Sequence, residues 1–372
     1  MKQIPRFSSF LCSLVFSLTA HVQAQKPQYE SGDINIPAAK ADEPMRDSFS
    51  LTAAKRYLSQ GSKAWTEARQ CVSCHTNGTF MQLAPTFGRI FHKQVEDHRA
   101  FFLSESAYLQ KASASSLKEG LQPTQLAYIA NGLAAYDVTK GSLSVETKAT
   151  LDLMLTAQSD DGSYNNLDCW PPFESSSYHG ATVAAMALAS APGYLEQVSE
   201  DQQKHIDTLK KYLQTTEPPH DYGRLLLLWT ATKWGGLISN QRKTATIELI
   251  LSHQQKDGGW SMRTFAAPEK WGGGIRKDLI SSEVEQEGTP SDGHQTGLAV
   301  MVLREAGVPA DHKAIRAGIK WIKSNQRKSG RWWTRSLNGD GQQFITYSGT
   351  FYPLRALQLC GELDQKQPAA LK

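Results

Sequence analysis

The sequence predicts an all-α protein assembled from repeated helical units, and two observations support this class. After residue 48 the apolar residues recur at helical spacing, and no run of alternating apolar and polar residues is long enough to build a sheet. In addition, one pattern occurs three times: a helix, a glutamine, a short polar turn, a glycine and an aromatic residue. A chain of 372 residues can bury a substantial core, so these units have enough length to pack together.

Residues 1–24 have the features of a secretory signal peptide. Lys2 and Arg6 provide a positive start, and Phe10–Ala20 is a short, mostly apolar run. The sequence Val22-Gln23-Ala24 places small residues where a signal peptidase cleaves, so we expect the mature chain to begin at Gln25. The expected location is therefore periplasmic or secreted.

The mature chain is expected to have no membrane span and no nucleic-acid partner. No later stretch approaches the roughly 20 apolar residues that a membrane helix needs. Loss of residues 1–24 removes two positive charges and no negative ones, so the formal charge falls from +4 to +2, and no basic block is present. Residues 25–48 are rich in Pro, Asp, Lys and Ala, which predicts a flexible, extended lead-in.

The three best copies of the repeat have the turns Gln158–Tyr164, Gln254–Trp260 and Gln326–Trp332. The glycine in each turn can adopt the backbone conformation that ends a helix. The aromatic ring can then fold back onto the helix end, where the glutamine amide can bond backbone groups that the helix leaves free. The pattern therefore predicts a structural role for these residues.

Further helices are predicted between and around these units from the same periodicity. One helix precedes each unit, a degenerate unit with a following helix lies in the middle of the chain, and a terminal helix completes the set. In that order the expected ranges are Gln125–Tyr136, Tyr178–Ser190, His294–Glu305, Ile206–Gln214, Asp221–Trp234 and Phe344–Cys360.

The repeat resembles that of the squalene cyclase and protein prenyltransferase superfamily. The resemblance covers about residues 120–360, and it implies an α/α toroid, a single closed ring of inner and outer helices in residues 120–372 with a central cavity. Residues 49–119 look like a divergent first repeat. The whole chain is similar to secreted bacterial cyclase-like proteins that carry a Cys-x-x-Cys-His motif in that first repeat.

The segment Cys71-Val72-Ser73-Cys74-His75 is the most specific chemical motif in the chain. In c-type cytochromes, two cysteines at this spacing bond covalently to the haem, and the histidine that follows binds the iron. The sequence therefore predicts covalent haem c, held by Cys71, Cys74 and His75, with His75 as the metal ligand. A redox disulfide between the two cysteines, or a zinc site with a distant fourth ligand, are the alternatives.

The sixth iron ligand is not assigned by the sequence. Class I cytochromes c supply a methionine well downstream of the haem motif, and here the next candidates are Met81 and Met154. His92 and His98 are further candidates, although a lone histidine on a helix is usually a surface residue. An open sixth position would favour small-ligand or redox chemistry.

Catalytic residues of the related enzymes are poorly matched. The run Asp-x-Asp-Asp of hopene cyclases is absent from the chain, and Asp160-Asp161 lies in a repeat turn where Asp257 takes the equivalent place, which indicates turn formers. Prenyltransferase-type zinc binding would need an Asp, a Cys and a His. Asp168-Cys169 with His179 or His294 offers the residue types without the family spacing.

Three function classes follow from these patterns. The first is a haem-bearing binding or redox module for an apolar, terpenoid-like small molecule, with a redox partner protein. The second is a toroid enzyme, either a terpenoid cyclase with an atypical acid or an exported polysaccharide lyase. A lyase would use Arg263 or Arg276 with Glu283 or Asp292, in an insertion that departs from the repeat. The third is a non-catalytic scaffold.

Overall fold

A computed structural model describes residues 26–166, 171–272 and 275–363 of the chain. The helices are α1 (Leu51–Arg69), α2 (Thr79–Leu83), α3 (His92–Leu109), α4 (Ala114–Leu117), α5 (Gln122–Lys140), α6 (Val145–Thr156), α7 (Ser177–Ser190), α8 (Glu200–Thr215), α9 (Asp221–Lys233), α10 (Asn240–Ser252), α11 (Ile275–Glu287), α12 (Gly293–Glu305), α13 (Lys313–Ser324) and α14 (Ile345–Leu359). A π-helical turn η1 (Cys74–Gly78) and a 3₁₀ segment η2 (Ala84–Ile90) flank α2. The strands β1 (Tyr29–Ser31) and β2 (Ile34–Ile36) form a short antiparallel hairpin.

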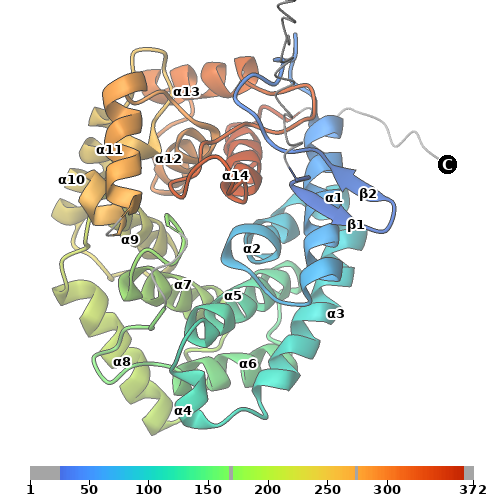
Figure 1. Cartoon of the computed structure of the whole chain (residues 1–372). Helices are drawn as coiled ribbons and strands as arrows, with labels where there is room; N and C mark the ends of the chain where they lie inside the picture. Colours follow the sequence, from blue (N-terminus) through green and yellow to red (C-terminus); the bar gives the residue numbers. More distant parts are fainter. Residues whose placement is uncertain (1–25, 167–170, 273–274, 364–372) are drawn as a thin grey trace, which may run out of the picture.

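The helices form a closed ring, which confirms the predicted α/α toroid. The inner helices α2, α5, α7, α9, α12 and α14 each contact the next in this order, and α14 contacts α2 again (Figure 1). The helices α1, α3, α6, α8, α10 and α13 lie around them on the outside of the ring (Figure 1). Each helix predicted from the periodicity is present within a few residues of its expected bounds.

Serine residues start four of the outer helices. Ser50, Ser144, Ser199 and Ser239 precede α1, α6, α8 and α10, and each side-chain oxygen accepts a hydrogen bond from a backbone N–H of the first helical turn. Such caps satisfy N–H groups that have no partner within the helix, and replacing one by alanine typically costs about 1 kcal/mol. Local sequence therefore sets where these outer helices begin.

The repeat glutamines join one unit of the ring to the next. The amide of Gln254 donates to the carbonyl of Gly258 in its own turn at 2.8 Å and to the carbonyl of Ala314 in α13 at 2.9 Å. Gln158 makes the same pair of bonds, to Gly162 at 3.3 Å and to His205 in α8 at 3.0 Å. The glutamine is thus a bridge between neighbouring outer helices as well as a cap.

The aromatic residue of each unit folds back on its own helix, as the pattern predicts. The indole N–H groups of Trp260 and Trp332 donate at 2.7 Å to carbonyls ten residues earlier, and the hydroxyl of Tyr164 does the same at 3.3 Å. All three rings are fully buried. The glycine of the turn is required as well. Gly258 has a φ of 91°, and a Cβ there would come within 3.0 Å of the carbonyl oxygen of Ala317.

The last repeat closes the ring onto the first. Gln326 donates to the carbonyl of Gly330 at 2.9 Å and to the carbonyl of Ser50, the cap of α1, at 3.0 Å. Its amide oxygen accepts from the backbone N–H of Ser50 at 2.7 Å. The third copy of the motif therefore makes, across the chain ends, the same connection that the other two copies make between adjacent units.

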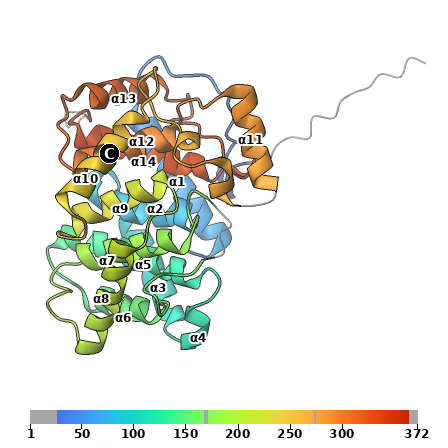
Figure 2. The ribbon, with the colours of Figure 1, turned by 90° about the vertical axis from the view of Figure 1, so that its left-hand side faces the viewer.

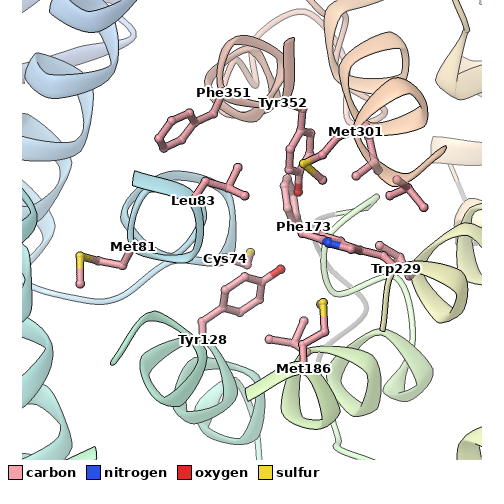
Figure 3. Close-up of a cluster of buried hydrophobic side chains, with 14 of the residues drawn as sticks. Cys74, Met81, Leu83, Tyr128, Phe173, Met186, Trp229, Met301, Phe351 and Tyr352 are labelled. Carbon is pink, nitrogen blue, oxygen red and sulfur yellow. The ribbon is translucent and has the colours of Figure 1, made fainter. Parts of the chain in front are cut away.

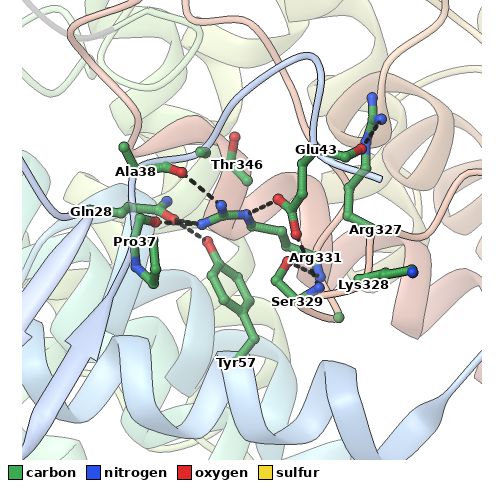
Figure 4. A network of polar contacts seen from close by, with 12 residues as sticks. Gln28, Pro37, Ala38, Glu43, Tyr57, Arg327, Lys328, Ser329, Arg331 and Thr346 are labelled. Carbon is green, nitrogen blue, oxygen red and sulfur yellow. Dashed lines mark hydrogen bonds and ion pairs between the residues drawn. The ribbon is translucent and has the colours of Figure 1, made fainter. Parts of the chain in front are cut away.

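The lead-in is tied to this closure, although its composition predicts a flexible segment. Arg331 is buried and lies at the centre of the contacts in Figure 4. Its guanidinium pairs with the carboxylate of Glu43 at 2.7 Å and donates to the carbonyls of Pro37 at 2.8 Å and Ala38 at 2.7 Å. It also reaches Gln28 at 3.1 Å. The lead-in from residue 26 onward thus packs against the last repeat.

The axis of the ring is lined by buried side chains. Figure 3 shows Cys74, Tyr128, Phe173, Met186 and Tyr352 converging there from different parts of the ring. None of these five is more than 4% exposed. The resemblance implies a cavity at the ends of the inner helices, and one described pocket is lined there by residues near the starts of α5, α7 and α14.

An insertion departs from the repeat after the second turn. It contains two short 3₁₀ segments, η3 (Met262–Thr264) and η4 (Pro268–Trp271), and the helix α11, which projects from one face of the ring (Figure 2). Among the described residues, no helix is both long and apolar enough to cross a membrane.

Candidate functional site

The Cys71–His75 segment connects the outer helix α1 to the inner ring. Helix α1 ends at Gln70, whose left-handed backbone (φ 48°, ψ 41°) turns the chain away from the helix. Ser73 is extended (φ −112°, ψ 144°), and η1 starts at Cys74. The cysteines therefore stand on either side of an extended stretch, at the point where the chain enters the ring.

One asparagine holds the two ends of this segment together. The amide of Asn77 donates to the carbonyl of Cys71 at 2.9 Å and to the hydroxyl of Thr66 in α1 at 3.1 Å. Its oxygen accepts from the backbone N–H of Ser73 at 2.7 Å. Asn77 is completely buried, so these bonds compensate for its desolvation and fix the loop.

A glycine allows the segment to turn tightly. The backbone N–H of Gly78 donates to the carbonyl of Ser73 at 2.8 Å, and a Cβ at this position would lie 2.4 Å from that carbonyl oxygen and 2.9 Å from the ring of Tyr128. The hydroxyl of Thr79 also donates to the carbonyl of Cys74 at 2.7 Å. The residues after the motif thus determine its shape.

The motif forms one wall of a pocket of about 730 Å³. This volume lies within the range of roughly 300–1,000 Å³ that is typical of small-molecule and cofactor sites. The walls come from the lead-in, the end of α1, the motif itself and the loops before α5, α7 and α14. The lining residues are Lys26, Pro27, Gln28, Tyr29, Trp65, Arg69, Cys71, Val72, Ser73, Cys74, His75, Leu121, Gln125, Glu174, Gly341, Gln342, Gln343 and Phe344.

His75 is held between two aromatic rings. The edge of its ring meets Trp65 with the centroids 4.7 Å apart, and Phe344 lies at the same distance on another side. The Nδ1 atom is 2.8 Å from the hydroxyl of Thr76. The side chain is 6% exposed, and burial lowers its pKa to about 3, so the ring is neutral at pH 7. A neutral imidazole is the form that binds metals.

The two cysteines have different surroundings. Cys71 is half-buried and is a free thiol, and burial, reinforced by the charge of Glu105 and opposed by Arg69, raises its pKa. Cys74 is only 4% exposed and points towards the ring axis close to Tyr128 (Figure 3). Cys71 is therefore the more accessible of the two, while Cys74 connects the pocket to the buried centre.

The candidate sixth ligands all lie outside this pocket. Met81 points away from the ring axis on the opposite side of α2 from Cys74 (Figure 3), and Met154 is fully buried beneath the first repeat turn. His98 is buried, and its Nδ1–H donates to the carbonyl of Gln94 at 2.7 Å, whereas His92 is largely exposed. Among the described residues that line the pocket, His75 is the only histidine, and no methionine is present.

Two tyrosine–histidine pairs at the ring centre were not predicted as pairs. The hydroxyl of Tyr128 lies 3.0 Å from Nε2 of His179, and that of Tyr222 lies 3.1 Å from Nε2 of His294. The Nδ1 atom of His294 is 2.8 Å from Ser348, while Nδ1 of His179 is buried with no hydrogen-bond partner. The recurrence of His or Tyr near inner-helix starts is the signal that could have found them.

The acidic and basic residues of the insertion are paired with one another. Arg263 forms a buried ion pair with Glu283, with Nε and Oε2 3.1 Å apart, and Arg276 donates to Asn338 and to the carbonyl of Trp271, both at 2.9 Å. Asp292 caps α12 and accepts from two backbone N–H groups, while burial raises its pKa to about 6. These contacts give the four residues structural roles.

The remaining acidic candidates are turn formers, as predicted. Asp161 accepts from the backbone N–H of Ser163 at 2.9 Å, and Asp257 accepts from that of Gly259 at 3.0 Å. Asp168 and Cys169 lie outside the described residues. Within those residues, no group of three or more His, Cys, Asp and Glu side chains has an arrangement that could hold a metal ion.

Two comparisons with known proteins bear on this architecture. Residues 222–360 match the family model described as the squalene-hopene cyclase C-terminal domain. A protein of Sinorhizobium fredii described as a probable squalene–hopene cyclase is 27% identical over 220 residues, which are 54% of this chain and 33% of that protein. The chain thus spans about a third of the length of this curated relative.

Both findings support the squalene cyclase superfamily for the toroid. The matched range starts at Tyr222 in α9 and ends at Cys360, so it contains the last two repeat motifs and the closing helix α14. The Cys71–His75 segment lies outside this range. The family model therefore covers the second half of the ring, and of the residues that line the pocket it includes Gly341–Phe344.

Proposed function

We propose that the protein is a haem-c-bearing binding or redox module, built on a squalene cyclase-like toroid and acting in the periplasm or outside the cell. The observation that carries this proposal is the position of Cys71, Cys74 and His75 together on the wall of the 730 Å³ pocket. A motif of this kind could equally have been buried in the core or spread over an outer surface. Here both thiols and the imidazole border a space of ligand size.

The residues around the pocket suit a haem. Cys71 and Cys74 would hold it covalently, and His75, with Nδ1 occupied by Thr76, would offer Nε2 as the iron ligand. Lys26 and Arg69 also line the pocket and could pair with the two carboxylates of the cofactor. A bound haem would supply one-electron chemistry and an iron site for a small ligand.

The apolar part of the wall supports an additional apolar ligand. Trp65, Val72, Leu121 and Phe344 provide aromatic and aliphatic surface next to the motif. Leu121 is 43% exposed, so it adds accessible apolar surface to the rim of the pocket. We infer that an apolar, terpenoid-like small molecule binds here and that a separate redox protein exchanges electrons with the site.

A pyridine haemochrome spectrum tests the cofactor. The full chain would be produced for export together with c-type cytochrome maturation proteins, beside the variant Cys71→Ser/Cys74→Ser. We expect covalent haem in the wild type and none in the double variant. Cys360→Ser is the matched control, because that thiol is half-buried and distant from the pocket, and it should keep the full haem content. Wild-type protein without haem would refute the proposal.

A non-catalytic scaffold is the second candidate function. It is favoured by the buried side chains that line the ring axis. The space described for a ligand is then the pocket beside Cys71–His75, which is larger than the neighbouring pocket lined by Trp333 and Arg335. Absence of haem, combined with no apolar compound in an organic extract of the purified protein, would support the scaffold. A cyclase with an atypical acid is less supported, because Asp292 is engaged in capping and is largely ionised at pH 7.

A further inference from the structure

A chain of two hydroxyl groups leads from His75 to the lead-in. The Nδ1 atom of His75 is 2.8 Å from the hydroxyl oxygen of Thr76, and that oxygen is 3.1 Å from the hydroxyl of Tyr29 in β1. Thr76 is completely buried and Tyr29 is 5% exposed, so neither group exchanges its partner freely with water. The two hydroxyl groups that lead away from His75 thus come from η1 and from the N-terminal hairpin.

The hairpin is well placed to hold Tyr29 in this chain. Tyr29 contacts Tyr347 of α14 edge to face, with the centroids 6.0 Å apart, and a Cβ on Gly61 of α1 would come within 3.2 Å of its ring. Its hydroxyl is the part that reaches Thr76. Packing on two sides therefore fixes the Tyr29 ring independently of the hydrogen bond.

The hydroxyl chain can carry its protons in either of two directions. In the first, Tyr29 donates to Thr76, and Thr76 donates to Nδ1 of His75, which places the ring proton on Nε2. In the second, Nδ1–H of His75 donates to Thr76, and Thr76 donates to Tyr29. Because a hydroxyl both donates and accepts, the two arrangements have the same heavy-atom positions.

We propose that Thr76 and Tyr29 are positioning residues that control which nitrogen of His75 carries the proton. Without a ligand the first direction gives every donor of the chain a partner except Nε2–H of His75. Binding of iron at Nε2 requires the second direction, in which Thr76 accepts from Nδ1–H. This inference rests on the proposed haem site and adds the residues that set the electron donation of its axial histidine.

The hydroxyl chain is testable in the haem-free protein. Wild-type chain produced without maturation proteins would be labelled with ¹⁵N-histidine, and the ring nitrogens of His75 would be followed by NMR. We expect the Nδ1 resonance to move in Thr76→Val and to return in Thr76→Ser, with a smaller move in Tyr29→Phe. Thr86→Val is the control, because that hydroxyl donates to the carbonyl of Leu83 and is not in contact with His75.

The second readout is the midpoint potential of haem-loaded protein. Hydrogen bonding from Nδ1–H makes an imidazole ligand more electron-donating and stabilises the oxidised metal. The potential should therefore rise in Thr76→Val, rise less in Tyr29→Phe, and stay at the wild-type value in Thr76→Ser and Thr86→Val. Equal potentials across all five proteins would overturn the proposal even where haem is bound.

The two readouts separate this inference from the haem proposal. If the wild type binds no haem, the NMR series still decides whether the hydroxyl chain reaches Nδ1 of His75. Indifference of the His75 resonances to both Thr76→Val and Tyr29→Phe would overturn the chain itself. If Thr76→Val does not fold, Tyr29→Phe, which removes only the far hydroxyl of the chain, still provides the comparison with the wild type.

Discussion

At the scale of single residues, burial of the histidines at the ring centre lowers their pKa values strongly. Burial lowers the pKa of His179 and of His294 to about 3, from the ordinary value near 6.5. Both rings are neutral in the folded chain and would take up a proton on unfolding at mildly acidic pH. Each histidine therefore favours the unfolded state increasingly as the pH falls.

This sign gives a prediction for acid stability. A group whose pKa is lowered by folding contributes its full stabilising free energy above its unfolded pKa. For these histidines that contribution is lost as the pH falls from about 6.5 towards 3. His179→Gln should therefore lower the slope of unfolding free energy against pH by up to about 1.4 kcal/mol per pH unit between pH 6 and pH 4. Urea denaturation across that range measures the slope.

The matched variant for this measurement is His92→Gln, because His92 is largely exposed. It should keep the wild-type slope. Asp292, whose raised pKa acts with the opposite sign, is common to all three proteins and cancels in the comparison. A His179→Gln slope equal to that of the wild type would show that His179 is protonated in the folded chain or stays neutral after unfolding.

The sequence identified the residues of the candidate site and not the residues that support them. Cys71, Cys74 and His75 are recognisable because their spacing is local. Tyr29 lies 47 residues from Thr76, and the walls of the pocket come from segments whose proximity depends on ring closure. Asn77 is close to the motif in the sequence, yet the sequence alone does not show whether an asparagine is buried or exposed.

At the scale of elements, the crossing of α12 and α14 depends on a glycine and a proline. A Cβ on Gly297 would lie 2.2 Å from the backbone nitrogen of Pro353 and 2.5 Å from the carbonyl carbon of Tyr352. Pro353 lies within α14 and has no N–H hydrogen, so α12 can approach the helix backbone directly at this point. The two helices are consequently packed with backbone against backbone.

Gly297→Ala should force these helices apart. Overpacking of a filled core usually costs about 1–3 kcal/mol, and here the obstacle is backbone, which moves less readily than a side chain. The expected result is a loss of unfolding free energy at or above that range, measured by urea denaturation. Gly235→Ala is the control, because a Cβ there would meet nothing within 4 Å. Similar stability of the two variants would contradict the close crossing.

The elements that were predicted well are those specified by neighbouring residues. Gln158, Gln254 and Gln326 each precede a turn glycine and an aromatic ring, and the turn chemistry is contained within seven residues. The hairpin of the lead-in was not predicted, since β1 and β2 have three residues each, and Gln28 beside them bonds to Tyr57 and Arg331, which lie 29 and 303 residues away. Helix α11 has no repeat pattern to identify it.

At the scale of the whole molecule, Arg331 secures the contact between the two ends of the chain. Arg331→Met would leave the carboxylate of Glu43 without its ion pair, remove the guanidinium donor from the carbonyls of Pro37 and Ala38, and leave the amide oxygen of Gln28 with its bond from Tyr57. Breaking a buried ion pair by removing one partner costs about 3–5 kcal/mol. We expect residues 26–46 to detach from the ring.

Hydrogen–deuterium exchange on the full chain measures this detachment. Backbone amides of the lead-in should exchange faster in Arg331→Met, while those of α5 and α7 on the opposite side should be unchanged. Lys328→Met is the matched control, because it removes an exposed positive charge from the same turn. Unchanged protection of the lead-in would show that the hairpin packing alone holds this segment in place.

The closed ring could be predicted as a fold class because the repeats are similar to those of a known superfamily. The position of the pocket could not. It depends on the lead-in crossing the loop before α14, where Gln28 donates to the carbonyl of Gln343 at 2.9 Å and Ala39 donates to its side chain at 2.6 Å. Contacts across 315 and 304 residues leave no periodic signal in the sequence.

The bond between Gln326 and Ser50 has a consequence for how the chain must fold. It joins residues 276 positions apart. The entropic cost of closing a very long loop must therefore be compensated before this bond can stabilise the fold. In an open solenoid each unit can be added to a growing stack, whereas here the first and last units complete one another. Half-synthesised or half-translocated chains would lack this last connection. The ring is therefore a structure that forms late, when the entire chain is present, and its pocket acquires all of its walls only at that moment.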